Sequence, residues 1–177
     1  METALIYEIK KGNTQAFKQL YNEYFDYAMR VATAITNHTN AADAVQETFI
    51  RVYKNIQSYE ESKPFRPWFY RILVNECNRY LKKSTKDIPT DIQEDLILPQ
   101  EDPHPFEEYE DLYDAIQQLE DIHKVPLVLK YLNDFTEQDI ATVLELNVNT
   151  VKSRLYKARL KLKETILKSK GGIKDGT

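Results

Sequence analysis

The 177-residue chain contains one cysteine, four glycines and no long apolar run. A single cysteine, Cys77, cannot form an internal disulfide, so we expect a cytoplasmic protein in which Cys77 is an inert core residue. So few glycines disfavour glycine-rich phosphate loops and turn-dense β architectures. No segment approaches the roughly 20 apolar residues of a membrane helix, and the first residues lack the apolar run behind a basic start that marks a targeting signal.

Signatures of catalysis and of metal binding are also missing. The histidines, His38, His104 and His123, are scattered along the chain. No paired His/Cys spacing, nucleophile elbow or phosphate loop accompanies them. We therefore expect no enzyme activity, no metal or other cofactor, and no small-molecule substrate.

The net charge of −4 is unusual for a protein that binds nucleic acid. The acidic excess is confined to the middle of the chain, because residues 84–111 hold one basic and ten acidic residues. The flanking segments, 1–83 and 112–177, are both mildly basic. Since DNA responds to local rather than net charge, both flanks remain candidates for DNA binding.

Apolar residues recur at helical spacing through most of the segment before residue 84. Asn13 and Asn40 are suitable N-caps for two helices, and Pro67 suits the first turn of a third. Trp68 and Phe69, on this third helix, are expected to build the core.

The segment 84–108 interrupts the helical pattern with prolines among carboxylates. It buries little apolar surface, which predicts a flexible linker. Helical spacing returns near Leu112, and no strand of useful length appears. The sequence thus predicts an all-α fold with two small helical domains, 1–83 and 109–177, joined by an acidic flexible linker, 84–108.

A short helix, a turn and a longer basic helix are predicted after residue 135. Thr136 and Asp139 have the spacing of a capping box. Asn149 either caps the second helix, expected at about 150–168, or adopts unusual backbone angles in the turn. Four apolar residues share one face of this second helix: Val151, Leu155, Ala158 and Leu162. Basic residues lie off that face. The pattern is typical of a helix-turn-helix, whose second helix enters the major groove of DNA.

Three segments resemble the extracytoplasmic-function sigma factors, the small members of the sigma-70 family. TVKSRLYKARLKL is similar to their recognition-helix motif. AADAVQETFIRVYKNI resembles the segment that binds core RNA polymerase, and FRPWFYRILVNECNRYLKK resembles the promoter-melting and minus-10 segment. The three occur in the family's order, and the resemblance as a whole covers roughly residues 10–83 and 110–167.

The chain departs from the family pattern at several positions. Ala42 stands where the first motif usually has Glu, and Asn78 where the second often has Asp. Glu145 replaces a frequent Gly in the helix-turn-helix turn, and Asn147 and Asn149 replace a frequent Pro and Gly. Asparagine suits a turn, so these changes bear on promoter preference rather than on the fold.

The resemblance implies an alternative sigma factor that binds core RNA polymerase and directs promoter-specific transcription initiation. The implied core-polymerase contacts are Asp43, Gln46, Glu47 and Arg51. The implied contacts with the melted minus-10 element are Tyr59, Lys63, Phe65, Arg66, Asn75, Asn78, Arg79, Lys82 and Lys83. Within this set, the loop 59–64 is the better candidate for capturing a flipped base, because aromatic faces stack on bases and basic neighbours hold phosphates.

The helix-turn-helix would bind the minus-35 element as duplex DNA. Its implied contacts are Lys130, Thr150, Lys152, Ser153, Tyr156, Lys157 and Arg159. Tyr156 is equally suited to pack against the protein. The family further implies a role in stress response and control by an anti-sigma factor, often membrane-bound, which would hold a cytoplasmic chain at the membrane.

Three other functions remain as alternatives. An ordinary helix-turn-helix regulator would bind duplex DNA unaided, usually at a palindrome. The second alternative is an enzyme, but the sequence contains no recognisable catalytic site. An all-helical adaptor would bind only protein, so that neutralising Lys152 and Lys157 together would leave its activity intact.

Overall fold

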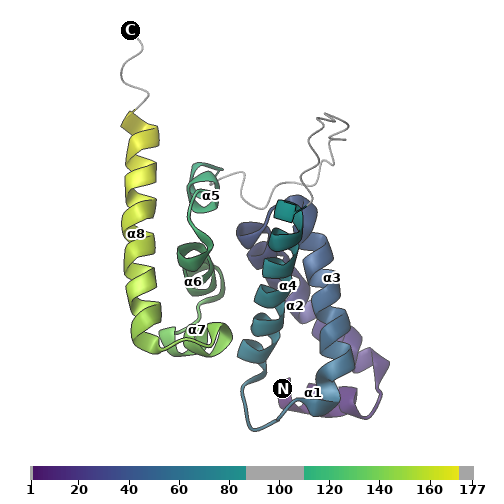
Figure 1. Cartoon of the computed structure of the whole chain (residues 1–177). Helices are drawn as coiled ribbons and strands as arrows, with labels where there is room; N and C mark the ends of the chain where they lie inside the picture. Colours follow the sequence, from purple (N-terminus) through teal and green to yellow (C-terminus); the bar gives the residue numbers. More distant parts are fainter. Residues whose placement is uncertain (1, 87–109, 172–177) are drawn as a thin grey trace, which may run out of the picture.

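The computed structural model describes residues 2–86 and 110–171, and every regular element within these ranges is a helix (Figure 1). The first range holds α1 (Glu2–Lys10), α2 (Thr14–Ile35), α3 (His38–Asn55), the short 3-10 helix η1 (Ile56–Ser58) and α4 (Phe65–Lys86). The second holds α5 (Glu110–Gln117), α6 (Asp121–Asn133), α7 (Glu137–Leu144) and α8 (Val148–Gly171). The predicted all-α fold with two helical domains is confirmed. Most of the predicted linker lies outside the described residues.

Local capping decides where the long helices of the N-terminal domain begin. The Asn13 side chain caps α2 as predicted, accepting hydrogen bonds from the backbone amides of Gln15 and Ala16 at 3.1 and 3.2 Å. The predicted start of α3 at Asn40 is wrong, because Asn37 caps this helix and its side chain accepts from the amide of Asn40 at 2.9 Å. An earlier asparagine in extended backbone therefore starts the helix three residues sooner.

An aromatic cluster fills the core between α2, α3 and α4. Phe69 is fully buried, and its ring centroid lies 4.7 Å from that of Tyr24 and 5.3 Å from that of Phe49. Trp68 is partly buried against the same core, so both aromatic residues expected there contribute to it. Cys77 is fully buried as well, and burial raises the pKa of its thiol to about 12, which keeps it in the unreactive protonated form.

The C-terminal domain begins its helix-turn-helix with the predicted capping box. The Thr136 hydroxyl accepts from the Asp139 amide at 3.1 Å, and the Asp139 carboxylate accepts from the Thr136 amide at 3.1 Å. Glu145 ends α7 in the left-handed conformation with φ of 54°, a setting that favours glycine. The predicted cap at Asn149 is wrong: Asn147 accepts from the Asn149 amide at 2.8 Å, and α8 begins at residue 148.

The two domains pack against each other, and residues from both belong to one continuous hydrophobic cluster. In Figure 1, α5, α6 and α7 lie between α8 and the N-terminal bundle. α2 packs against α5 and α6, while α4 packs against α7. The rings of Tyr70 and Phe135 meet edge to face at 5.2 Å, and the Gln117 side chain donates to the Ala34 carbonyl at 2.7 Å. Among the helices in the described ranges, none is long and apolar enough to cross a membrane.

An ion pair closes the rim of this interdomain contact, with Arg71 Nη1 of α4 3.0 Å from Glu145 Oε1. We expect Arg71→Glu or Glu145→Arg alone to shift free chains toward separated domains by about 1.4- to fivefold, because an exposed pair is worth roughly 0.2–1 kcal/mol. The double exchange restores the pair with reversed charges and should restore the compact state. Small-angle scattering of the free chain measures this through its radius of gyration.

The matched control for Arg71→Glu is Lys18→Glu, which makes the same change of charge at an exposed position of α2. It should scatter like the wild-type chain. Equal radii of gyration for both single variants and the wild type would contradict the expectation.

Candidate polymerase and nucleic-acid interfaces

α8 separates an apolar face from a basic one, as the sequence predicts. Val151 and Ala158 are fully buried and Leu155 is nearly so, while Leu162 packs against a smaller apolar cluster beside them. Each predicted minus-35 contact on this helix is exposed: Thr150, Lys152, Ser153, Tyr156, Lys157 and Arg159. Tyr156 is 62% exposed, which settles its alternatives in favour of the surface. The first turns of the second helix therefore expose a polar and basic face to solvent.

Two predicted minus-35 contacts already have partners on the same domain. Lys130 Nζ lies 3.3 Å from Glu137 Oε1, and the pKa of Glu137 is lowered by its backbone hydrogen bond and by this lysine. Arg159 donates from Nε to the Tyr131 hydroxyl at 2.7 Å. The first contact holds Lys130 beside the start of the helix-turn-helix, and the second holds Arg159 against α6.

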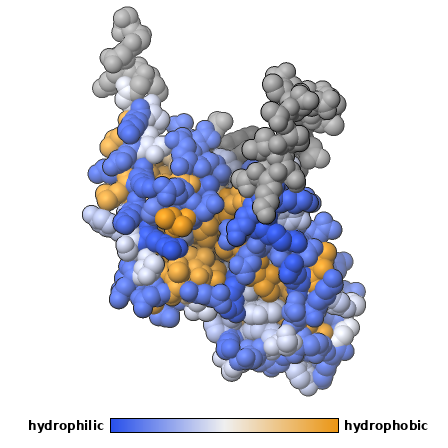
Figure 2. All heavy atoms as spheres, viewed as in Figure 1, coloured by the Kyte–Doolittle hydropathy of each residue, from blue (hydrophilic) through white to orange (hydrophobic). Residues whose placement is uncertain are grey.

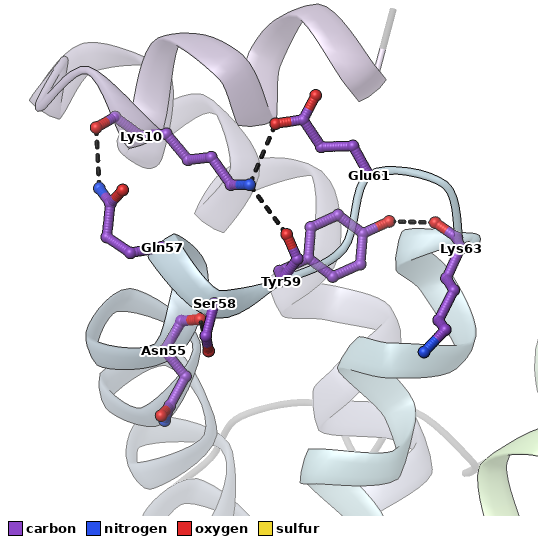
Figure 3. Close-up of polar contacts among 7 residues, drawn as sticks. All are labelled: Lys10, Asn55, Gln57, Ser58, Tyr59, Glu61 and Lys63. Atoms are coloured by element: carbon purple, nitrogen blue, oxygen red, sulfur yellow. Dashed lines mark hydrogen bonds and ion pairs between the residues drawn. The ribbon is translucent and has the colours of Figure 1, made fainter.

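The loop between η1 and α4, residues 59–64, is anchored at both ends (Figure 3). Tyr59 is 6% exposed, with its ring centroid 5.4 Å from that of Phe65 and 4.9 Å from that of Trp68. Its hydroxyl donates to the backbone carbonyl of Lys63. The residues between these anchors, 60–63, are exposed. The loop thus presents a short surface segment on a buried aromatic support.

The two aromatic residues assigned to the minus-10 element are both buried. Phe65 is 2% exposed and packs against Tyr24, Tyr59 and Trp68, which leaves no open face of its ring for a base. The sequence signal was their position beside basic residues, and this signal does not distinguish a stacking platform from the support beneath it.

The remaining minus-10 candidates lie along α4, except for Lys63, which lies in the loop. Asn75, Arg79, Lys82 and Lys83 are exposed, whereas Asn78 is half-buried. Arg79 Nη2 lies 2.7 Å from the buried Glu76 Oε2. Lys63 is 2.8 Å from Glu60.

Arg66 differs from the other minus-10 candidates because it contacts the C-terminal domain. Its guanidinium donates to the backbone carbonyl of Asn133 and lies 4.7 Å from the centroid of the Phe135 ring. A residue assigned to the minus-10 element is thus engaged by the domain that carries the helix-turn-helix. No periodicity within one domain could have revealed this contact.

The predicted polymerase contacts occupy one side of α3. Asp43 and Gln46 are exposed, and Glu47 Oε1 lies 3.4 Å from Arg51 Nε. The same Arg51 atom lies 2.5 Å from the buried Glu76 Oε1, so this arginine joins α3 to α4.

A second feature beside Gln46 was missed from the sequence. α2 and α3 form an apolar groove of about 720 Å³, lined in part by Phe17, Tyr21, Gln46 and Tyr53. Tyr21 and Tyr53 are 37% and 54% exposed. The clue in the sequence was Tyr53, because the apolar face of α3 that includes this tyrosine is wider than the face that the core buries. Exposed aromatic groups beside polar ones are typical of protein interfaces.

A similar groove of about 590 Å³ lies on the C-terminal domain, between α5, α6 and α8. Its lining includes Leu112, Ile116, Tyr131 and Leu167, and Figure 2 shows apolar surface between α8 and the α5–α6 pair. Each domain therefore combines a charged surface with an apolar groove.

Comparison with known families matches both domains. The family model described as sigma-70 region 2 matches residues 20–86, and the model described as sigma-70 region 4 matches residues 109–162. The chain therefore belongs to the sigma-70 family, as an extracytoplasmic-function RNA polymerase sigma factor. Proteins of this family are transcription-initiation factors, so the chain is not an enzyme.

Relatives and solved structures are similar over most of the chain. The ECF RNA polymerase sigma-E factor of Haemophilus influenzae is 27% identical over 173 residues, covering 89% of this chain and 91% of the relative. The ECF RNA polymerase sigma factor SigM of Bacillus subtilis is 30% identical over 152 residues, covering 82% and 91%.

Two solved structures share the fold. CnrH in complex with the cytosolic domain of CnrY has a TM-score of 0.68 at 21% identity, covering 92% of this chain and 94% of that one. The sigma factor RpoE of Bartonella quintana, in complex with the anti-sigma factor NepR, has a TM-score of 0.69 at 24% identity, covering 85% and 96%.

The exposed basic face of α8 gives a direct prediction. Lys152→Ala and Lys157→Ala should each weaken promoter binding by the holoenzyme by about 1–3 kcal/mol if the lysine contacts a base. If the lysine contacts a phosphate, the slope of log affinity against log salt should fall by about one. Titrating a promoter fragment at several salt concentrations separates these cases. Lys18→Ala, an exposed lysine of the other domain, is the control, and unchanged affinity and slope in both α8 variants would contradict the assignment.

Proposed function

We propose that the chain binds core RNA polymerase through α3 and reads two promoter elements, one with each domain. The observation that carries this proposal is the basic face of α8, which its buried stripe turns toward solvent. Residues near the start of such a helix reach base edges in the major groove, where lysine and arginine can donate to guanine or to phosphate. We assign the minus-35 contacts to Thr150, Lys152, Ser153, Tyr156, Lys157 and Arg159, with Lys130 as a phosphate contact.

The N-terminal domain would bind the melted minus-10 element. The exposed loop residues 60–63 offer a surface for an unstacked base. Tyr59 and Phe65 would act here as the support of the loop, because their rings are buried. Arg66, Asn75, Asn78, Arg79, Lys82 and Lys83 would hold bases and phosphates along α4, with Lys63 at the loop.

The polymerase contact would combine polar and apolar parts of one surface. Asp43, Gln46, Glu47 and Arg51 supply the polar part, which steers association and fixes orientation. The groove beside Gln46 supplies exposed aromatic side chains, which are enriched among residues that dominate binding energy. A helical, charged partner surface with apolar side chains fits this combination.

The interdomain contact supports a dependence on polymerase. In the compact chain the Arg66 guanidinium already has partners in Asn133 and Phe135, and DNA would have to compete with them. Two separate readers also gain affinity only when their spacing is fixed, through effective concentration. We therefore expect weak DNA binding by the free chain, and polymerase would supply the separation between its domains. We propose residues 1–83 and 109–177 as the functional units.

We further propose regulation by an anti-sigma factor that covers both domains. Two structures that share this fold are complexes. RpoE of Bartonella quintana is described with the anti-sigma factor NepR, and CnrH with the cytosolic domain of CnrY. The two apolar grooves, one on each domain, would accept apolar side chains of one partner. The chain would then act in the cytoplasm in a stress response, held at the membrane where its partner is membrane-bound.

Run-off transcription on a library of genomic promoter fragments tests the proposed function. Purified core polymerase with the chain should initiate at a discrete set of start sites, and core polymerase alone should not. Gln46→Ala should reduce association with core enzyme, while Lys18→Ala serves as the control for an exposed residue without an assigned role.

The other possible functions predict different results. A helix-turn-helix regulator would protect duplex DNA without polymerase and create no start site. An adaptor would keep its activity when Lys152 and Lys157 are both replaced by alanine. Either result would contradict the proposed function.

A further inference from the structure

We propose that Lys10 is a positioning residue for the minus-10 loop, residues 59–64, which it holds from a helix that the sequence pattern did not reveal. The proposal rests on the proposed function of this loop. α1 lies before residues 20–86, the segment that the region 2 family model matches. It ends beside the loop in Figure 3, and so places a cation next to the segment assigned to an unstacked base.

The Lys10 side chain contacts two residues at the start of the loop, Tyr59 and Glu61. Its Nζ donates to the backbone carbonyl of Tyr59 at 2.8 Å and lies 3.0 Å from Glu61 Oε1. The Lys10 side chain is 20% exposed, and Nζ is 5.8 Å from the centroid of the Tyr59 ring. One ammonium group therefore satisfies the carbonyl of Tyr59, directly after η1, and also orients the carboxylate of Glu61.

The backbone at the end of α1 is also bonded to η1, the helix directly before the loop. The carbonyl of Lys10 accepts a hydrogen bond from Gln57 Nε2 at 2.8 Å. Gln57 belongs to η1, directly before the loop, so the end of α1 and the start of the loop are joined in both directions. Two hydrogen bonds between residues almost 50 positions apart fix how these segments lie relative to each other.

The far end of the loop is held by the side chain of Tyr59, the residue whose backbone carbonyl Lys10 binds. The Tyr59 hydroxyl donates to the carbonyl of Lys63 and its ring packs on Trp68. Burial raises the pKa of Tyr59, with the carboxylates of Glu2 and Glu61 adding to the effect, so the hydroxyl stays a donor at neutral pH. Only the exposed residues between these anchors remain to adapt to a base. A loop ordered before binding loses less conformational entropy when it binds.

A purely structural role for Lys10 is distinguishable, because α1 has other anchors. Ile6 and Ile9 are 2% and 3% exposed in the shared core. They should keep α1 packed when the Lys10 ammonium is removed. The chain also supplies a matched control in Lys11, the next residue, which is exposed and whose Nζ lies 4.1 Å from the centroid of the Tyr7 ring.

The test compares Lys10→Met, Lys10→Arg and Lys11→Met in the full chain. Methionine keeps an apolar stem of similar length and removes the charge and donor. The first readout is open-complex formation by the holoenzyme. It is monitored through the permanganate reactivity of minus-10 thymines and through the fluorescence of 2-aminopurine placed in the minus-10 strand. Core-polymerase affinity and the thermal unfolding midpoint are measured for the same proteins.

We expect Lys10→Met to lower open-complex formation by roughly tenfold, the size of losing one hydrogen bond to a charged group. Affinity for core polymerase should stay at the wild-type value, and the chain should remain folded at the assay temperature, although the unfolding midpoint falls by a few degrees, about the size of losing one such bond. Lys10→Arg should recover most of the loss, and Lys11→Met should match the wild type. Equal behaviour of Lys10→Met and the wild type overturns the proposal, as does a parallel loss in polymerase affinity, which would indicate a structural role.

Amide hydrogen exchange of the free chain separates this proposal from the proposed function. The amides of residues 60–63 should exchange faster in Lys10→Met than in the wild type or in Lys11→Met. If the wild-type holoenzyme opens no promoter, the proposed function fails. The positioning by Lys10 is then decided by exchange alone, and unchanged rates in Lys10→Met overturn it.

Discussion

Burial of Val151, Leu155 and Ala158 fixes how α8 is rotated about its own axis. These three residues pack toward α6 and α7, and each has almost no exposed surface. At 3.6 residues per turn, the intervening side chains must then point away from the domain. The direction of Lys152 and Lys157 is therefore a consequence of core packing, and a rotation of the helix would have to expose the apolar stripe to water.

The same relation between a buried support and an exposed reader recurs in the N-terminal domain. There the support is aromatic: Phe65 packs against Tyr59 of the minus-10 loop, Tyr24 and Phe69 pack against Phe65, and all of these are almost entirely buried. The loop itself is short and exposed, so its shape depends on what is attached to each of its ends. α1 contributes at one end, which gives a helix outside the matched family segment a defined place in the architecture.

The sequence predicted best those features that depend on one helix at a time. The buried and exposed faces of α8 follow from spacing alone, and the capping box at Thr136 follows from two residues three positions apart. Helix starts were less certain where several polar residues compete, as the displacement from Asn40 to Asn37 shows. A short helix such as α1 has too few turns for its spacing to stand out.

Features that depend on two distant segments could not be read from the sequence. Arg66 and Asn133 are 67 positions apart, and nothing in either local pattern indicates that they meet. The burial of Phe65 is similar, because an aromatic residue beside basic ones suits both a stacking surface and a core. These two residues show why the minus-10 assignments needed the structure more than the minus-35 assignments did.

The central claim, that core packing turns the basic face of α8 toward promoter DNA, is tested most directly by crosslinking. A photoreactive phenylalanine analogue in place of Tyr156, which is 62% exposed, would be irradiated in the holoenzyme bound to a promoter. The account predicts crosslinks to duplex DNA near the minus-35 element, and none from the same group in place of the buried Leu155. Crosslinks from position 156 to protein alone would contradict it.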